Sequence, residues 1–136
     1  MSVDVVSVGV VCADVMVRPV EELPARGSLG LVPKLEIHLG GLAGVTAAVL
    51  CRLGAKAAFM GKLGQDGFGD YILNALTSHG VDVSRVTRTA ECCTSATVVL
   101  ISEDGERTFL HHVGTNVLTS ENDIDFEVVK SANVLH

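Results

Sequence analysis

The 136-residue sequence has no cluster of basic residues and no long apolar run. Its formal net charge of −6 argues against a protein that binds the phosphate backbone of nucleic acids, because such binding needs grouped Lys and Arg. No apolar stretch is long enough to cross a bilayer, and the N-terminus lacks the basic and apolar regions of a signal peptide. We therefore expect a cytoplasmic protein without a nucleic-acid or membrane partner.

The four cysteines include no pair with the CxxC spacing of a metal or redox site. The neighbours Cys92 and Cys93 would need unusual geometry to form a disulfide, so we expect reduced thiols. His111 and His112 follow each other in a predicted strand and point to opposite faces, so they cannot share one metal ion in regular geometry. We predict that the chain has no metal site.

Common catalytic motifs are missing as well. Gly61-Lys62 is not part of a Walker P-loop, because no second Gly-Lys-Ser/Thr follows. The spacing of Ser, His and Asp residues assembles no triad. The first predicted strand leads into Cys12-Ala13-Asp14 and not into Gly-x-Gly-x-x-Gly, which disfavours a fragment of a Rossmann dehydrogenase.

The composition is that of a folded α/β protein, with 48% hydrophobic and 19% charged residues, and the length suits one domain with a real core. Residues 4–11 are β-branched apart from Asp4, Ser7 and Gly9, a pattern typical of a central parallel strand buried on both faces. Asp14 stands just past the carboxyl end of this strand, where open α/β sheets bind ligands. A turn-capping role for Asp14 is an equal alternative at this point.

A turn of small residues, an alanine-rich helix and a short strand with a glycine-rich loop form one unit. The helix covers 42–53 and ends at Gly54, which suits a left-handed C-cap, and the strand lies within 56–63. Glycines at such turns let backbone approach a ligand closely, so we interpret the unit as a ligand-binding architecture. It comprises the stretches 40–47, 50–54 and 61–69.

Prolines and glycines between residues 16 and 39 break any helix, so this segment leaves the main sheet. The last apolar pair, Val134-Leu135, indicates a strand whose continuation is missing, and we expect the domain to extend beyond His136. The pattern predicts these further elements: a strand over 31–38, a helix over 68–79 ended by Gly80, a strand over 81–86, a hairpin of 95–101 and 107–113 around Asp104-Gly105, a capping box from Ser120 to Asp123, and a helix over 126–132.

A series of short motifs follows a specific order along the chain: Cys12-Ala13-Asp14 after the first strand, Leu23-Pro24, Gly40-Gly41, 48–54, 61–69, Gly80-Val81-Asp82, Gly105-Glu106-Arg107-Thr108, and Gly114-Thr115-Asn116. Their order and spacing together resemble the N-terminal part of the ribokinase family, the PfkB carbohydrate kinases. The resemblance runs from Val3 to His136, which is less than half of a full-length member.

The resemblance implies a ribokinase-like fold, a doubly wound and mostly parallel α/β sheet with flanking helices and a small β-sheet lid, incomplete at its C-terminus. Residues 1–136 would form a single partial domain, with lid segments at about 15–38 and 95–113. The lid would exclude water, because phosphoryl transfer must favour the substrate alcohol over hydrolysis. In several relatives the lids also meet, which implies a homodimer through the β lid.

The implied activity is the transfer of the γ-phosphoryl group of ATP to a hydroxyl of a sugar or nucleoside. ATP and Mg²⁺ are the implied cofactors, with their principal binding residues outside this chain. The catalytic Gly-Ala-Gly-Asp segment of the family does not occur, so no catalytic residue lies in this chain. We expect this polypeptide alone to be inactive. The alternative is a non-catalytic small-molecule binding or dimerisation module on the same fold.

Matched to the family motifs, Asp14 is the aspartate that binds substrate hydroxyls, since a carboxylate can accept from two vicinal hydroxyls at once. Gly40 and Gly41 match the paired glycines that let substrate approach the backbone. Asp66 lies in a Gly-x-Asp-x-x-Gly loop, where we predict that it holds the turn and does not contact ligand. Asn116 is expected to shape a loop.

Three positions depart from the family pattern. Val45 replaces an asparagine of the substrate pocket, Cys12 stands where ribokinase has an asparagine, and Leu42 replaces a residue that is frequently polar. These side chains line the expected pocket with less hydrogen-bonding capacity, and a polyol would lose about 1 to 3 kcal/mol for each hydroxyl left unpaired. Either the substrate is less hydroxylated than a simple sugar, or selection on the site has relaxed.

Overall fold

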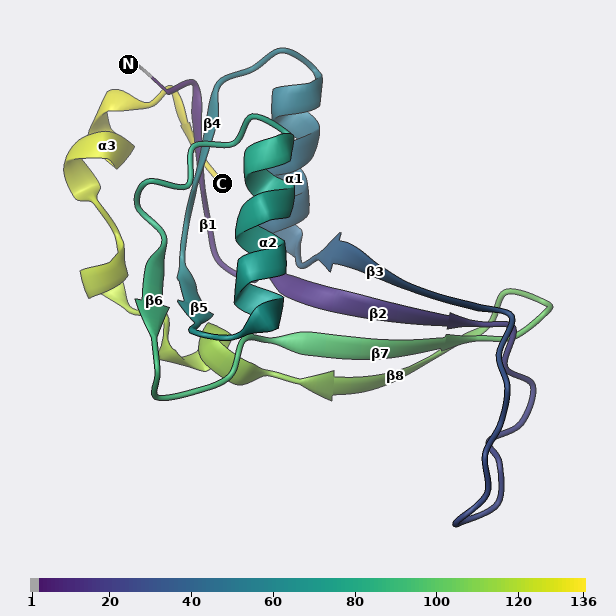
Figure 1. Ribbon diagram of the computed structural model, residues 1–136. Coiled ribbons are helices and arrows are strands. Elements are labelled where there is room, and N and C mark those ends of the chain that lie inside the picture. Colours follow the sequence, from purple (N-terminus) through teal and green to yellow (C-terminus); the bar gives the residue numbers. More distant parts are fainter. Residues whose placement is uncertain (1–2) are drawn as a thin grey trace.

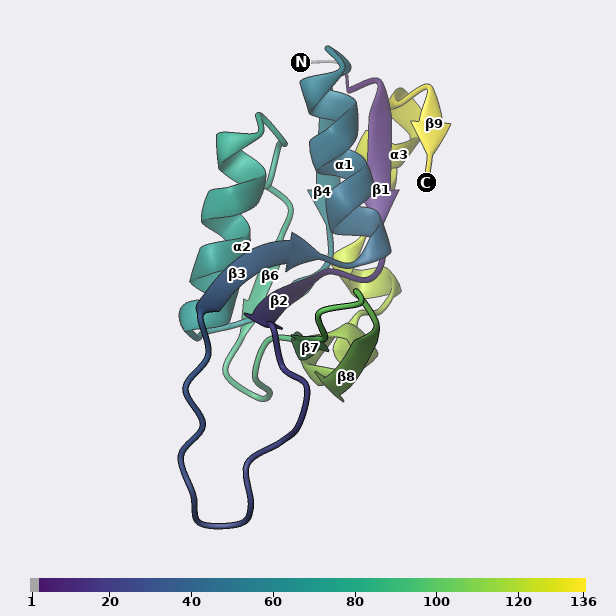
Figure 2. The same cartoon turned by 90° about the vertical axis from the view of Figure 1, so that its right-hand side faces the viewer.

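A computed structural model describes residues 3–136. Its first sheet is parallel, with β1 in the centre, β4 on one side and β9 on the other. The helices α1 and α2 cover one face of this sheet, and α3 covers the other (Figures 1 and 2). The elements of this layer are β1 (Val5–Val8), α1 (Leu42–Arg52), β4 (Ala57–Met60), α2 (Gly67–Ser78), α3 (Phe126–Ser131) and β9 (Val134–Leu135).

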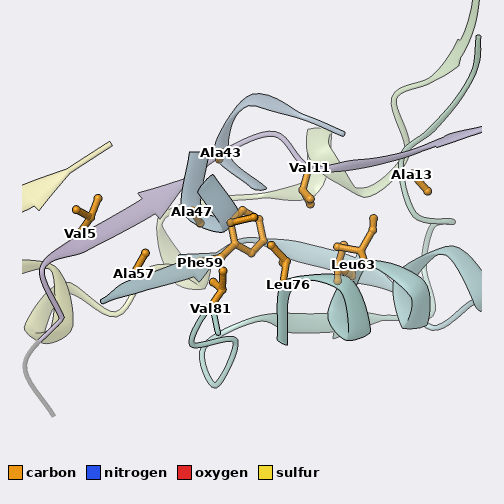
Figure 3. Close-up of a cluster of buried hydrophobic side chains, with 12 residues drawn as sticks. Val5, Val11, Ala13, Ala43, Ala47, Ala57, Phe59, Leu63, Leu76 and Val81 are labelled. Carbon is orange, nitrogen blue, oxygen red and sulfur yellow. The ribbon is translucent and has the colours of Figure 1, made fainter. Parts of the chain in front are cut away.

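The main core lies between the parallel sheet and the helices α1 and α2. Phe59 from β4 is fully buried, and Figure 3 shows it at the centre of the cluster, with Ala47, Leu76 and Val81 around it. Alanines on the inner face of α1 let this helix approach the sheet closely. Burial of each large apolar side chain contributes about 1.5 to 3 kcal/mol. A smaller cluster on the other face packs α3 against β1 and β4.

Both long helices form where the sequence predicts them. The helix α1 ends one residue before its predicted end, and Gly54 follows it with φ of +96°. The side chain of Asp66 caps α2 by accepting a hydrogen bond from the backbone N–H of Gly69 at 2.8 Å, and Gly80 follows the helix with φ of +83°. The predicted strand at 134–135 is also confirmed, as β9.

The second sheet has four strands in the order β3-β2-β7-β8. The pairs β2/β3 and β7/β8 are antiparallel, while β2/β7 is parallel. Its strands cross the direction of the first sheet, and the loop from 19 to 33 extends away from the rest of the chain (Figures 1 and 2). The predicted hairpin is confirmed, with a turn at Gly105. The strands are β2 (Cys12–Arg18), β3 (Lys34–Gly40), β7 (Ala96–Ile101) and β8 (Arg107–His112).

The first strand is shorter than the sequence predicts, which changes the position of Asp14. The strand β1 ends at Val8, and Gly9 turns the chain with φ of +137°. The strand β2 then begins at Cys12. Asp14 is therefore the third residue of a strand in the second sheet, so both earlier interpretations, the end of a central strand and a turn cap, are wrong. The β-branched run conceals this break, because glycine alone marks it.

The predicted strand over 81–86 is also wrong. Only a single bridge joins Ala58 to Asp82, and the Asp82 carboxylate then accepts a hydrogen bond from the backbone N–H of Ser84, which turns the chain. The strand forms later, as β6 (Thr87–Thr89), and it pairs with β5 (Lys62–Gly64). The strand predicted over 31–38 likewise lies further along the chain, as β3.

Asp123 anchors the segment that follows β8, which contains two short 3-10 helices, Gly114–Leu118 and Glu121–Asp123. Its carboxylate accepts from the Ser120 backbone N–H at 2.9 Å and the Thr87 hydroxyl at 2.8 Å, and it pairs with Lys62 at 3.1 Å. Burial opposes ionisation, but these hydrogen bonds outweigh it and lower the pKa of Asp123. The predicted capping box from Ser120 to Asp123 is confirmed.

Across residues 3–136, no helix is long and apolar enough to span a membrane.

Candidate functional site

Asp14 belongs to a row of polar side chains that runs across the four-stranded sheet. Asp14 on β2 is in register with His38 on β3 and with Thr97 on β7, and Thr97 is in register with His111 on β8. Residues opposite each other in a sheet project from the same face. The fold therefore gathers four polar side chains, from segments up to 97 residues apart, on one face beside the N-terminus of α1.

Gly40 leaves the space that the Asp14 carboxylate occupies. A Cβ atom at position 40 would overlap both oxygens and Cγ of Asp14. Gly41, with φ of +85°, begins α1, and a Cβ there would lie 2.6 Å from the carbonyl oxygen of Val10. Both glycines thus have a local reason to lack side chains, in addition to the substrate approach that the family resemblance implies.

Cys12 lies beneath the candidate site and supports Asp14. Its thiol donates a hydrogen bond to Oδ1 of Asp14 at 3.1 Å, and it accepts one from the Thr97 hydroxyl at 3.9 Å. Burial, together with the hydrogen bond to Asp14 and the charge of Asp14, raises the pKa of Cys12 to about 12. The thiol therefore stays protonated at neutral pH and remains a donor.

Asn116 fixes the turn between β1 and β2, as expected of a residue that shapes a loop. Its side-chain oxygen accepts from the backbone N–H of Val11 at 3.3 Å, and its amide donates to the carbonyl of Val11 at 3.0 Å. Asp66 also holds a loop, because its carboxylate accepts from the backbone N–H of Thr94 at 2.7 Å as well as capping α2. Burial opposes its ionisation, but the hydrogen bonds prevail and lower its pKa.

Val45 and Leu42 lie in the first turn of α1. Val45 lines a shallow groove of about 260 Å³ with His38 and Tyr71, between α1, α2 and β3. Leu42 is 79% exposed in the first turn of α1. The structure thus brings Asp14, Cys12 and Gly40 together, with Gly41 adjoining, and places these two apolar residues on α1.

Sequence reasoning missed three members of the polar row: His38, Thr97 and His111. Their strands were recognised, and alternation shows which residues of one strand share a face. The registers that set these residues beside Asp14 join distant segments, and no local pattern encodes them. For His111 the sequence alone favours surface or lid packing over a metal site.

The residues needed to hold Mg²⁺ with ATP are not assembled here. Among residues 3–136, no three His, Cys, Asp or Glu side chains lie close enough together to hold a metal ion. The Asp14 carboxylate, which contacts Cys12 and lies against Gly40, repels phosphate. The described residues therefore do not fit the nucleotide and its metal.

Comparisons with known proteins identify the family of this chain. The family model of the pfkB carbohydrate kinases matches residues 3–136. Fructokinase-1 from Oryza sativa subsp. japonica is 34% identical over 111 residues, which cover 80% of this chain and 34% of that protein. Probable fructokinase-5 from Arabidopsis thaliana is 31% identical over 99 residues, covering 71% of this chain and 31% of that protein.

The fold is that of a sugar kinase of known structure as well. The structure of Arabidopsis thaliana ribokinase complexed with ribose and ATP matches 99% of this chain with a TM-score of 0.85 and 28% identity, and the match covers 45% of that ribokinase. The chain belongs to the PfkB family of carbohydrate kinases and has a ribokinase-like α/β fold. It spans about a third of the length of the curated relatives described above.

Proposed function

We propose that this chain forms the sugar-binding part of an ATP-dependent carbohydrate kinase, with Asp14 as the residue that recognises substrate hydroxyls. The observation that carries the proposal is the position of Asp14, beside Gly40 and the N-terminus of α1, on the polar face of the four-stranded sheet. A carboxylate accepts up to four hydrogen bonds, and Cys12 uses only one of them. The remaining lone pairs suit adjacent sugar hydroxyls.

A sugar is favoured over a nucleoside by the relatives. Those compared above are named fructokinase and ribokinase, and the ribokinase was solved with ribose and ATP. A sugar hydroxyl donates a charge-assisted hydrogen bond to a carboxylate, which is stronger than a bond to a neutral acceptor. Loss of the Asp14 charge should therefore weaken binding far more than it weakens the fold.

Phosphoryl transfer requires residues that this chain does not contain. In this proposal ATP and Mg²⁺ are held outside the described residues, and the missing Gly-Ala-Gly-Asp segment would supply the catalytic base. We predict no kinase activity for the purified 136-residue chain. A coupled assay for ADP release with ATP, Mg²⁺ and D-fructose or D-ribose tests this, and turnover above that of a heat-denatured sample would contradict it.

The four-stranded sheet would act as a lid within one partial domain, over the proposed segments 15–38 and 95–113. Its polar face carries Asp14, and its other face is mostly apolar, with His112 and Thr108 as polar exceptions on β8. On that face Leu35 and Leu110 are 65% and 61% exposed, and a groove of about 540 Å³ runs between Ile37, Phe68 and the start of β7. Exposed apolar patches of this kind mark interaction surfaces.

A second copy of the chain is the proposed occupant of this apolar face, which also fits the alternative of a non-catalytic dimerisation module. Sedimentation velocity should detect a dimer that Leu110→Lys dissociates, because the substitution buries a charge in the interface. Val117→Lys, at a residue that is 69% exposed and off the sheet, is the matched control. A monomer at all concentrations would contradict the proposed dimer and leave sugar binding to be judged by the next experiment.

Isothermal titration calorimetry with D-fructose and D-ribose tests the sugar site itself. We expect binding by the unaltered chain and at least a tenfold loss with Asp14→Asn, because a charged acceptor is worth about 1.5 to 3 kcal/mol. Glu91→Gln, at an exposed carboxylate, should bind as the unaltered chain does. Equal affinities of Asp14→Asn and the unaltered chain would overturn the role of Asp14, and no binding of either sugar would overturn the proposed function.

A further inference from the structure

The two neighbouring cysteines Cys92 and Cys93 lie in the loop between β6 and β7. Neither takes part in a disulfide, Cys92 is half-buried, and Cys93 is exposed. The other two cysteines lie near opposite ends of α1, because Cys12 pairs in register with Gly40, just before the helix, and Cys51 belongs to its last turn. The loop therefore presents two free thiols that are adjacent in the sequence.

The backbone that follows this pair is anchored by hydrogen bonds that do not use the thiols. The carbonyl of Cys93 accepts a hydrogen bond from the backbone N–H of Thr115 at 3.0 Å. Thr94 is 1% exposed, its N–H donates to the Asp66 carboxylate at 2.7 Å, and its hydroxyl accepts from the Gly64 N–H at 2.8 Å. The loop is therefore held in place while both sulfurs stay available.

The spacing of the two thiols suits a bridging atom better than a direct disulfide. Consecutive Cα atoms are about 3.8 Å apart, whereas a disulfide usually needs about 4.4 to 6.8 Å. An atom placed between the two sulfurs lengthens the link and relieves this mismatch. Trivalent arsenic with one organic substituent is such an atom, because it forms two bonds to soft thiol ligands.

An apolar groove adjoins Cys93 and offers a place for that substituent. The groove measures about 540 Å³, and Cys93 lines it together with Ile37, Phe68 and Ala96. Phe68 is 39% exposed, so its ring is accessible to a second aromatic group. Aromatic rings in contact attract each other beyond the effect of their buried area. The groove therefore favours an aryl substituent over a small polar one.

We propose that Cys92 and Cys93 form a dithiol site for a trivalent arsenical with one aryl substituent, which lies in the groove beside Phe68. With phenylarsine oxide the reaction breaks the arsenic–oxygen double bond and two S–H bonds, and it forms two arsenic–sulfur bonds and one molecule of water. Arsenic stays trivalent, so the reaction needs no oxidant or reductant. Because the second arsenic–sulfur bond closes within one chain, the adduct resists displacement by monothiols. This inference does not depend on the proposed sugar site.

Intact-mass spectrometry of the 136-residue chain with phenylarsine oxide tests the site. In millimolar 2-mercaptoethanol we expect one phenylarsenic group per chain, located in the tryptic peptide 89–107, which contains no other cysteine. The reagent 2,3-dimercaptopropanol should remove the group, because it supplies two thiols of its own. Cys92→Ser and Cys93→Ser should each weaken retention by about a hundredfold or more, whereas the matched control Cys51→Ser should retain the group.

A second pair of variants tests the position of the aryl group. Phe68→Ala should weaken retention about two- to tenfold, the effect of one lost aromatic contact, while Phe109→Ala, on β8 and outside the groove, should have no effect. The dimer proposed above would cover the groove, so these titrations use chain concentrations at which sedimentation shows monomers.

The outcomes separate the two parts of the inference. Release of the group by 2-mercaptoethanol, its location outside peptide 89–107, or full retention by either serine variant would overturn the dithiol site. Equal retention by Phe68→Ala and the unaltered chain would overturn the placement of the aryl group. The mapping of the unaltered chain needs no variant, so it decides the first part even if a substitution disturbs the fold.

Discussion

The two main sheets of this protein are built from the same strand-forming residues but have opposite surfaces. The parallel sheet is covered by helices on both faces, and its strands are nearly continuous apolar runs, with Ser7 of β1 as a buried polar exception. The four-stranded sheet has a polar face that carries Asp14 and a mostly apolar face that is exposed on its edge strands, at Leu35 and Leu110. From this contrast we expect stability to depend mainly on the first sheet and, under the proposed function, recognition to depend on the second, so substitutions in the two sheets should have different effects.

The largest expected effect is on the parallel sheet. Phe59→Ala removes a fully buried ring from the centre of the core, so it should lower the free energy of unfolding by about 3 to 5 kcal/mol. Chemical denaturation followed by circular dichroism measures the loss. Asp14→Asn, on the second sheet, is the comparison and should unfold close to the unaltered chain. Equal losses for the two variants would remove the distinction between the sheets.

A smaller effect is expected where the second sheet is packed most tightly. Gly40→Ala forces the Asp14 carboxylate aside, because the new Cβ would overlap it, and such overpacking costs about 1 to 3 kcal/mol. The free energy of sugar binding should fall by more than the free energy of unfolding. Gly67→Ala is the matched control, since a Cβ there meets nothing within 4 Å. If Gly40→Ala keeps both stability and affinity, the close contact with Asp14 does not exist in solution.

The smallest effect concerns Asp66, which links α2 to the start of β7. Asp66→Ala should cost about 0.5 to 2 kcal/mol at pH 7, the usual range for the loss of an N-cap side chain. Because the folded-state pKa of Asp66 is lowered, its contribution is present above the unfolded pKa of about 3.9 and is lost as the pH falls through the folded value. Denaturation curves should therefore show a smaller difference in unfolding free energy between the variant and the unaltered chain at pH 3 than at pH 7. An equal difference at the two pH values would be the contrary result.

Local signals predict the parts of the fold that neighbouring residues determine. Both long helices were predictable, because Gly54 and Gly80 end them and apolar spacing defines their inner faces. The end of β1 was not, since Gly9 breaks the backbone within an unbroken apolar run.

The candidate site shows the same difference between features set by local sequence and features set by distant segments. Asp14 and Gly40 were identified from motifs, but their direct contact and the addition of His111 depend on strand registers between distant segments. Such registers arise from the packing of whole strands and from the turn that Asn116 holds. For that reason a linear pattern could name the glycines and the aspartate without revealing which other polar residues face them.

The most direct test of sugar recognition on the polar face is an NMR titration of the isotope-labelled chain with D-fructose and D-ribose. We predict chemical-shift changes in β2 and β8 around Asp14 and His111, and at Gly40 and Gly41, with the exposed apolar side chains Leu35 and Leu110 unaffected. Chemical-shift changes confined to the apolar face, or no changes at millimolar sugar, would contradict sugar recognition on the polar face.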